Sequence, residues 1–175
     1  MIKVEHIAKK YGKVEALQDI SFEVEAGEIY GIIGPDGAGK TTLFRILTTL
    51  ILADKGNACL NGWDVRKDYR LIRNNIGYMP GRFSLYQDLS VEENLQFFAS
   101  IFKTRIETNY HLIKDIYQQL APFKKRRAGA LSGGMKQKLA LCCALIHKPL
   151  ILFLDEPTTG VDPVSRKELW DLLKQ

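Results

Sequence analysis

The segment Gly34–Thr41, which reads GPDGAGKT, constrains the fold of this chain more than any other feature. It matches the pattern GxxxxGKT, in which glycines let the backbone turn its N–H groups toward an anion. The pattern needs a strand before the loop and a helix after it. The apolar run at residues 28–33 predicts a buried strand, and residues 41–50 place apolar side chains at helical spacing. A phosphate-binding loop is expected, and an ordinary strand-to-helix turn is the alternative.

The pattern assigns a role to each part of this loop. Lys40 supplies a positive charge for the outer phosphates of a nucleotide, and Thr41 offers its hydroxyl to Mg²⁺. The helix that begins here adds the positive end of its dipole. Lys40 is expected to act in catalysis as well as in binding. The residues predicted to bind the nucleotide are Gly34, Pro35, Asp36, Gly37, Ala38, Gly39, Lys40, Thr41 and Thr42.

Two carboxylates follow a second apolar run, residues 151–154, in the segment ILFLDEP. They stand at the carboxyl end of the predicted strand, the edge at which parallel α/β sheets bind ligands. Asp155 is suited to hold Mg²⁺ beside Thr41, because magnesium keeps several waters and takes few protein carboxylates. Glu156 is then the candidate to accept a proton from, or orient, the water that attacks the γ-phosphate. A surface acid pair is the alternative that these two residues alone would allow.

Composition favours one globular domain. The chain has 175 residues, of which 46% are hydrophobic, enough to bury a core. No apolar run approaches the roughly 20 residues of a transmembrane helix, and early charged residues such as Lys3 and Glu5 do not resemble a secretory signal. The basic run at residues 124–127 is most simply a solvated surface, so no nucleic-acid partner is expected.

The three cysteines, Cys59, Cys142 and Cys143, form neither a metal-ligand spacing nor an even-numbered disulfide framework. Cys142 and Cys143 lie in the apolar stretch LALCCALI, which predicts buried, reduced thiols. A reducing, cytosolic location is therefore expected.

The order of local patterns predicts a β-rich beginning, a helical insertion and a return to strand and helix. Strands are expected at 2–5, 20–25, 57–60 and 76–79, with turns at Tyr11–Gly12 and Asn61–Gly62. Ser90 and Glu93 form a capping box before a helical region that extends to about residue 120, in which Leu112, Ile113, Ile116, Tyr117 and Leu120 share one face. Further helices are expected to begin near Met135 and near Asp162.

Between these elements, residues 131–137 read LSGGMKQ, and the chain here resembles the ATP-binding subunit of an ABC transporter. The segment is similar to the signature of that family, and the resemblance spans the whole chain. It implies that Ser132, Gly133 and Gly134 contact the γ-phosphate of a nucleotide held by a second subunit. A serine, two glycines and a helix N-terminus suit an anion, although a plain capped helix start is the alternative.

The resemblance implies two more nucleotide contacts. Tyr11 matches the aromatic residue that stacks on adenine in the family, and a strand-end tyrosine packed on the core is the alternative. Residues 160–162, which end at Asp162, resemble the loop that joins the active sites of the two subunits. The implied cofactors are ATP and Mg²⁺.

The family resemblance also implies the fold and the partners. The expected fold is the α/β fold of P-loop NTPases: a RecA-like parallel sheet, an antiparallel β-subdomain and an inserted α-helical subdomain at about 84–133. Residues 1–175 would be a partial ABC ATP-binding domain that lacks the C-terminal strands. The expected partners are an integral membrane permease subunit and a second, identical or different, ATP-binding subunit. The expected location is cytoplasmic, on the inner face of the cell membrane through the permease.

The segment FSLYQDLSVEENL resembles, more narrowly, the ATPases of ABC-2-type exporters. In such a transporter, the groove beside residues 82–88 is expected to receive a cytosolic helix of the permease, with Phe83 and Tyr86 as contacts. A non-transport ABC ATPase of the translation-factor type and a cassette that only binds nucleotide are the alternative functions.

The chain departs from the family pattern in two places. Gly81 stands where the family usually has a glutamine that touches Mg²⁺ and the attacking water, which predicts slowed or differently coupled hydrolysis. The switch histidine of the family is expected roughly thirty residues beyond Glu156, past Gln175, and His6, His111 and His147 do not match its motif. The strand that normally inserts between the phosphate-loop strand and the strand at 151–154 is also expected to be missing. The isolated chain is therefore expected to be a poorly active fragment of a longer ATPase.

Overall fold

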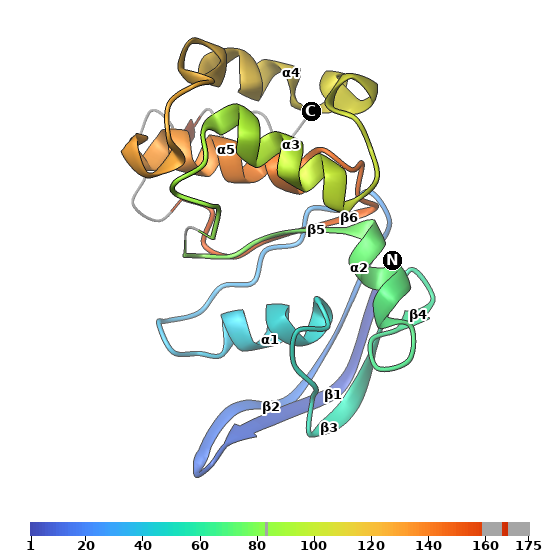
Figure 1. The fold of residues 1–175 in the computed structure, drawn as a ribbon. Coiled ribbons are helices and arrows are strands. Elements are labelled where there is room, and N and C mark those ends of the chain that lie inside the picture. Colours follow the sequence, from blue (N-terminus) through green and yellow to red (C-terminus); the bar gives the residue numbers. More distant parts are fainter. Residues whose placement is uncertain (83, 159–165, 168–175) are drawn as a thin grey trace. The chain divides into compact units, whose positions relative to one another are not determined.

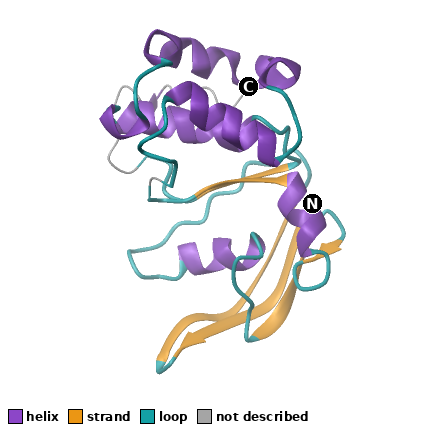
Figure 2. Cartoon of the chain, in the orientation of Figure 1, coloured by secondary structure: helices purple, strands orange, loops and turns teal. Residues whose placement is uncertain are grey.

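The computed structural model describes residues 1–82, 84–158 and 166–167. The chain divides into two compact units, residues 1–76 and residues 77–175. Each unit is built around its own small sheet with helices beside it (Figures 1 and 2).

An antiparallel sheet forms the centre of the first unit, with the strand order β2-β1-β3-β4. Its strands are β1 (Ile2–Tyr11), β2 (Val14–Val24), β3 (Lys55–Leu60) and β4 (Trp63–Asp64). The predicted strands and both predicted turns are confirmed, but β1 and β2 are longer than the sequence indicated. Val4, Ile7 and Leu17 are buried, so the sheet keeps one apolar face along its length.

Two helices accompany this sheet. The first, α1 (Lys40–Leu47), buries Leu43, Ile46 and Leu47, as its apolar spacing predicted. The second, α2 (Tyr69–Asn75), was not predicted, because only Ile72 of its seven residues is buried. The guanidinium of Arg73 donates to the Oγ1 of Thr49 at 2.8 Å and to its carbonyl at 2.7 Å. These two bonds fasten α2 to the segment that follows α1.

The strand predicted at residues 28–33 is wrong. These residues belong to no strand of the described chain, and Ile29 and Ile33 are 65% and 97% exposed. A β-branched run has strand propensity, but a strand also needs a neighbour to pair its N–H and C=O groups. No described strand pairs with this segment.

The second unit begins with a two-stranded parallel sheet of β5 (Ile76–Met79) and β6 (Ile151–Leu154). Both strands have the predicted bounds. Three helices pack together in this unit: α3 (Val91–Ile101), α4 (Ile106–Leu120) and α5 (Gly133–Leu145). Two short 3-10 helices, η1 (Ala121–Phe123) and η2 (Ala128–Ala130), connect α4 to α5. The core includes Leu95, Ile113, Leu120, Leu139 and Ile146, each fully buried.

Capping explains where these helices begin. The predicted box at the start of α3 is confirmed, since the Glu93 N–H donates to Ser90 Oγ at 3.2 Å and the Ser90 N–H donates to Glu93 Oε2 at 2.7 Å. The second bond is the main reason why the pKa of Glu93 is lowered. Ser132 caps α5 by accepting from the Met135 N–H at 3.4 Å. For this reason α5 begins at Gly133 rather than near Met135.

Cys142 and Cys143 are free thiols on α5, 0% and 2% exposed, as predicted. Burial raises the pKa of both thiols. A thiol with a raised pKa in the folded chain keeps its proton at a pH at which the unfolded chain loses it. Its contribution to stability is therefore complete below the ordinary pKa of 9.0 and is lost as the pH rises above it.

We expect Ellman's reagent to reach only the half-buried Cys59 in the folded chain, and slowly because burial raises the pKa of this thiol, and to reach all three thiols in the unfolded chain. The midpoint of urea unfolding should also fall as the pH rises above about 9, the ordinary thiol pKa. The double variant Cys142→Ala and Cys143→Ala is the control and should lose part of this pH dependence. Rapid labelling of three thiols in the folded chain would contradict the burial of this pair.

Candidate functional site

Gly39 determines the shape of the loop that precedes α1. Its backbone is left-handed, with φ of 88°, and it is the N-cap of the helix. A Cβ added at this position would lie 2.2 Å from the carbonyl oxygen of Ala16 and 2.8 Å from Cδ2 of Leu17. The loop can therefore pack against β2 only because residue 39 has no side chain.

The side chain of Lys40 folds back over the same loop. Its Nζ donates to the carbonyl of Gly34 at 2.7 Å and to the carbonyl of Pro35 at 2.9 Å. The first turn of α1 contains no acidic residue, and Thr41 and Thr42 lie half-buried within it. A lysine ammonium, the positive end of a helix and a glycine-rich backbone thus meet at one loop, which is the chemistry that binds phosphates.

The two predicted carboxylates occupy different environments at the end of β6. Asp155 is 3% exposed, and its N–H donates to the carbonyl of Met79 on β5 at 2.9 Å. Glu156 is exposed and has a left-handed backbone with φ of 52°. This conformation turns the chain sharply after the strand, so one carboxylate is buried and its neighbour is accessible to solvent.

Gly81, the departure from the family pattern, lies at this same strand edge. A Cβ at Gly81 would stand 3.2 Å from the carbonyl oxygen of Asp155 and 3.5 Å from Cβ of Glu156. A side chain here would therefore adjoin both carboxylate residues. Gln87 lies further along the same β5–α3 connection, where its backbone carbonyl accepts from the Gly129 N–H at 2.9 Å. The effect of Gly81 on hydrolysis stays a prediction.

Ser132 and Gly133 are exposed at the N-terminus of α5, and Gly134 is half-buried. The helix has 13 residues and no acid in its first turn, so its positive end is not neutralised locally. This arrangement suits an anion. Contact with a nucleotide on a second subunit stays a prediction.

Tyr11 ends β1 with its side chain 47% exposed, and Lys9 Nζ lies 5.8 Å from the centre of its ring. This exposure argues against the alternative that Tyr11 is a core residue. His6 and His111 are also exposed, whereas His147 stacks on Phe102. Asp162, the rest of its loop, the start of the helix predicted near it and Phe83 lie outside the described residues.

The predicted residues thus form a phosphate loop in the first unit and a carboxylate pair and a capped helix in the second. Within the described ranges, no group of three or more His, Cys, Asp and Glu side chains could hold a metal ion. The hydroxyl of Thr41 and the carboxylate of Asp155 are nevertheless the oxygen ligands that Mg²⁺ prefers, and it takes few from protein. The donor chemistry of these residues therefore fits magnesium.

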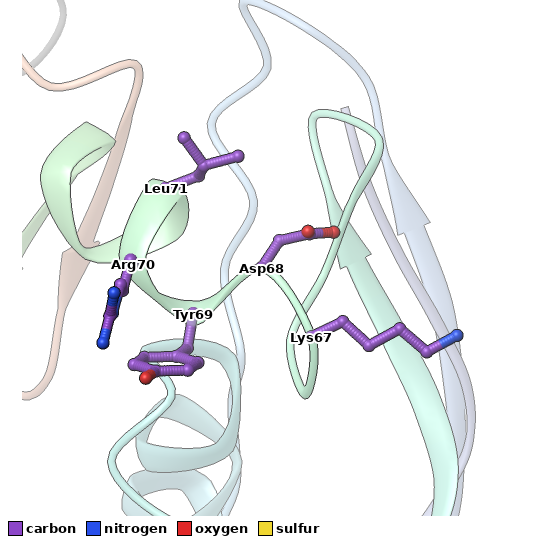
Figure 3. Close-up of a pocket in the computed structure, with 5 residues that line it drawn as sticks. All are labelled: Lys67, Asp68, Tyr69, Arg70 and Leu71. Carbon is purple, nitrogen blue, oxygen red and sulfur yellow. The ribbon is translucent and has the colours of Figure 1, made fainter.

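An open hollow of the first unit lies at the start of α2 and contains none of the predicted site residues. It is lined by Lys67, Asp68, Tyr69, Arg70 and Leu71, whose side chains diverge (Figure 3). The guanidinium carbons of Arg70 and Arg73 lie 5.7 and 5.3 Å from the centre of the Tyr69 ring, so this aromatic side chain already has partners. The hollow offers no convergent group for chemistry.

Residues 17–159 match the family model described as ABC transporter. Among curated proteins, the chain is 44% identical over 164 residues to the Probable multidrug ABC transporter ATP-binding protein YbhF of Escherichia coli, covering 91% of this chain and 28% of that one. It is 39% identical to the Doxorubicin resistance ATP-binding protein DrrA of Mycobacterium tuberculosis, covering 98% and 53%. It is 36% identical to the Linearmycin resistance ATP-binding protein LnrL of Bacillus subtilis, covering 100% and 57%. The chain thus spans between about a quarter and a little over half of the length of these relatives.

Solved structures agree with the relatives. The structure of an ATP binding subunit of an ABC transporter superposes with a TM-score of 0.88 at 26% identity, covering 99% of this chain and 73% of that one. The dimeric structure of MJ0796, a bacterial ABC transporter cassette, gives a TM-score of 0.86 at 27% identity, covering 99% and 81%. In the part of the chain that the structure describes, no helix is long and apolar enough to cross a membrane.

Proposed function

This chain belongs to the ATP-binding domains of the ABC transporter family, and on that premise we propose that it hydrolyses ATP to drive an exporter. The proposed machine is a pair of ATP-binding subunits that close over two nucleotides and act on a membrane permease. The relatives named for multidrug, doxorubicin and linearmycin resistance support the exporter assignment.

The observation that carries the proposal is the loop built around Gly39 and Lys40. Gly39 permits a backbone path that no other residue could follow without moving β2. Lys40 Nζ bonds to two carbonyls of the same loop. When a nucleotide binds, the ammonium would exchange these carbonyls for the outer phosphate oxygens, which are stronger acceptors because they are charged.

Catalysis would depend on positioning and charge rather than on a covalent intermediate. Lys40 and the loop N–H groups would hold the phosphates, and Thr41 and Asp155 would hold Mg²⁺, which supplies charge neutralisation when bound. Glu156 would orient the attacking water and accept its proton. Its exposure suits this role, since the carboxylate must reach solvent-derived water.

The remaining parts of the proposal concern partners. Ser132–Gly134 would complete the nucleotide site of a second subunit, and the dimeric form of MJ0796 supports the pairing of two such chains. Tyr11 would stack on the adenine, and Asp162 would join the two active sites. The permease would place the chain on the inner face of the cell membrane. A cassette that only binds nucleotide is the second candidate, because Gly81 leaves the carboxylate pair without the usual neighbouring side chain.

Thermal unfolding with and without MgATP tests the proposal. At a ligand concentration 100 times Kd, binding stabilises the folded state by about 2.7 kcal/mol, which raises Tm by roughly 5–10 °C for a chain of this size. The variant Lys40→Ala should lose this shift. Lys13→Ala, which removes an exposed lysine in the turn between β1 and β2, is the matched control and should keep it. A wild-type Tm that does not respond to MgATP would refute nucleotide binding by this chain.

A further inference from the structure

Two loops of the second unit lie side by side, although about forty residues separate them in the sequence. One connects β5 to α3, and the other leads from α4 to α5. Four backbone hydrogen bonds of 2.8–3.1 Å join them: the N–H groups of Gly129, Ala128, Val91 and Glu92 donate to the carbonyls of Gln87, Leu89, Arg126 and Lys124, respectively. Ser90 and Arg127 also form an antiparallel bridge. The two loops are therefore fastened like neighbouring strands.

A buried side chain holds the first of these loops. Asn94 on α3 is 0% exposed, and its Oδ1 accepts from the Tyr86 N–H at 3.0 Å. Its Nδ2 lies within hydrogen-bond distance of three loop carbonyls, those of Tyr86 at 2.9 Å, Leu89 at 3.2 Å and Ser90 at 2.9 Å. One amide thus binds both ends of the turn 86–90. Because these groups are buried, moving the turn away from Asn94 would leave them unsatisfied.

The second loop passes directly into the capped helix. Ala128 and Gly129, which donate to the first loop, belong to η2, and the buried Leu131 follows. The next residue, Ser132, caps α5. At the other end of the connection, Tyr86 is 52% exposed. Its ring meets the Phe97 ring edge to face, with 4.8 Å between the ring centres. The exposed Tyr86 side chain is thus linked to Ser132 through Asn94 and through the backbone hydrogen bonds that join the two loops.

We propose that Asn94 is a positioning residue that makes the turn 86–90 and the start of α5 move as one body. A partner that displaces Tyr86 would then shift Ser132 and the glycines beside it. This inference rests on the proposed function, in which Ser132–Gly134 completes a nucleotide site, and on the expectation from the family resemblance that the permease docks beside residues 82–88. Asn94 itself touches neither partner nor nucleotide, and it acts only through the loop it holds.

Hydrogen exchange of individual amides in this chain tests the link without any ligand. Asn94→Ala removes all four side-chain bonds. Asn94→Asp keeps the size and the acceptor for the Tyr86 N–H, but it removes the donor and sets a buried carboxyl group against three loop carbonyl oxygens, which should push the turn away. Asn109→Ala is the matched control, since Asn109 is also buried and donates to the Ile146 carbonyl at 2.7 Å, outside both loops.

Both Asn94 variants should increase exchange by about tenfold or more at Tyr86 and, across the ladder, at Ala128 and Gly129, because local opening becomes easier. Asn109→Ala should leave these amides unchanged. If Asn94→Asp accelerates exchange in the turn 86–90 alone, the two loops are not coupled and the inference is wrong. It is equally wrong if Asn109→Ala has the same effect on Ala128 and Gly129, because the response is then a general loss of stability.

A second measurement connects the link to function. In the transporter assembled with its permease, Asn94→Asp should reduce the stimulation of ATP turnover by the permease roughly two- to thirtyfold, the range of coupling lost along such networks. The affinity for MgATP should stay within about twofold, because the Asn94 side chain bonds to Tyr86, Leu89 and Ser90, none of which is predicted to bind the nucleotide. Full stimulation in this variant would overturn the inference. A wild-type chain that binds no MgATP would instead refute the proposed function and leave the exchange result standing.

Discussion

Replacing Gly39 with alanine is expected to abolish MgATP binding and to destabilise the first unit. The backbone at this position has φ of 88°, a conformation that costs an alanine roughly 1–2 kcal/mol. The larger cost is steric, because the new Cβ would lie 2.2 Å from the Ala16 carbonyl oxygen and 2.8 Å from Leu17 Cδ2. Either β2 or the loop must move. A moved loop no longer aims its N–H groups and Lys40 at one point.

We expect at least a hundredfold loss of MgATP affinity, which corresponds to about 2.8 kcal/mol, measured by titration calorimetry. Gly62→Ala is the matched control, since Gly62 also has a left-handed backbone, with φ of 84°, but has open space around it. Gly62→Ala should lower the free energy of unfolding, because its backbone is left-handed, and should leave the affinity for MgATP unchanged. Normal binding by Gly39→Ala would mean that the loop does not need its close approach to β2.

Local sequence signals predicted the elements whose ends are fixed by neighbouring residues. β5 and β6 have the predicted bounds, because each is a short apolar run with a clear stop, Pro80 after one and Asp155 after the other. The start of α3 was also predictable, since Ser90 and Glu93 cap it with their own side chains. The phosphate loop belongs to this group, because its glycines and lysine act on the backbone beside them.

Predictions failed where the decisive partner is remote in the sequence. Residues 28–33 have the composition of a strand, but no described strand pairs with them. The first strand was predicted to end at residue 5, because the alternation of polar and apolar side chains breaks there. In the structure a register shift between Val4 and Ile7, with His6 at φ of 53°, restores the buried face beyond the break. A bulge of this kind cannot be read from alternation alone.

The same reason explains why Asn94 was missed. In the sequence it is one polar residue in a helix, beside a capping box that accounts for the local pattern. Its importance comes from a turn that folds back over it and from a ladder to residues 124–129. Sequence reasoning identified the two ends of this connection, Tyr86 and Ser132, because each resembles a family motif. The link between them required the positions of backbone carbonyls.

A substitution in the carboxylate pair, Glu156→Gln, is expected to slow ATP hydrolysis strongly. Glu156→Gln should reduce the rate of ATP hydrolysis in the assembled transporter by roughly 10²–10⁴-fold, the usual contribution of a general base. Glutamine has nearly the same shape, and the left-handed backbone at this position is no less suited to it than to glutamate. MgATP affinity should therefore change by less than about threefold, under 1 kcal/mol. Phosphate release and nucleotide binding, measured on the same preparation, separate the two effects.

Two comparison variants make this test specific. Asp155→Asn changes the buried neighbour, which would hold Mg²⁺, so it should raise the magnesium concentration needed for binding as well as slow turnover. Glu107→Gln removes an exposed charge in the first turn of α4 and should change neither. If Glu156→Gln and Asp155→Asn instead had the same magnesium dependence, the division of roles between the two carboxylates would be wrong. The buried and the exposed environments at the end of β6 would then reflect only the turn that follows the strand.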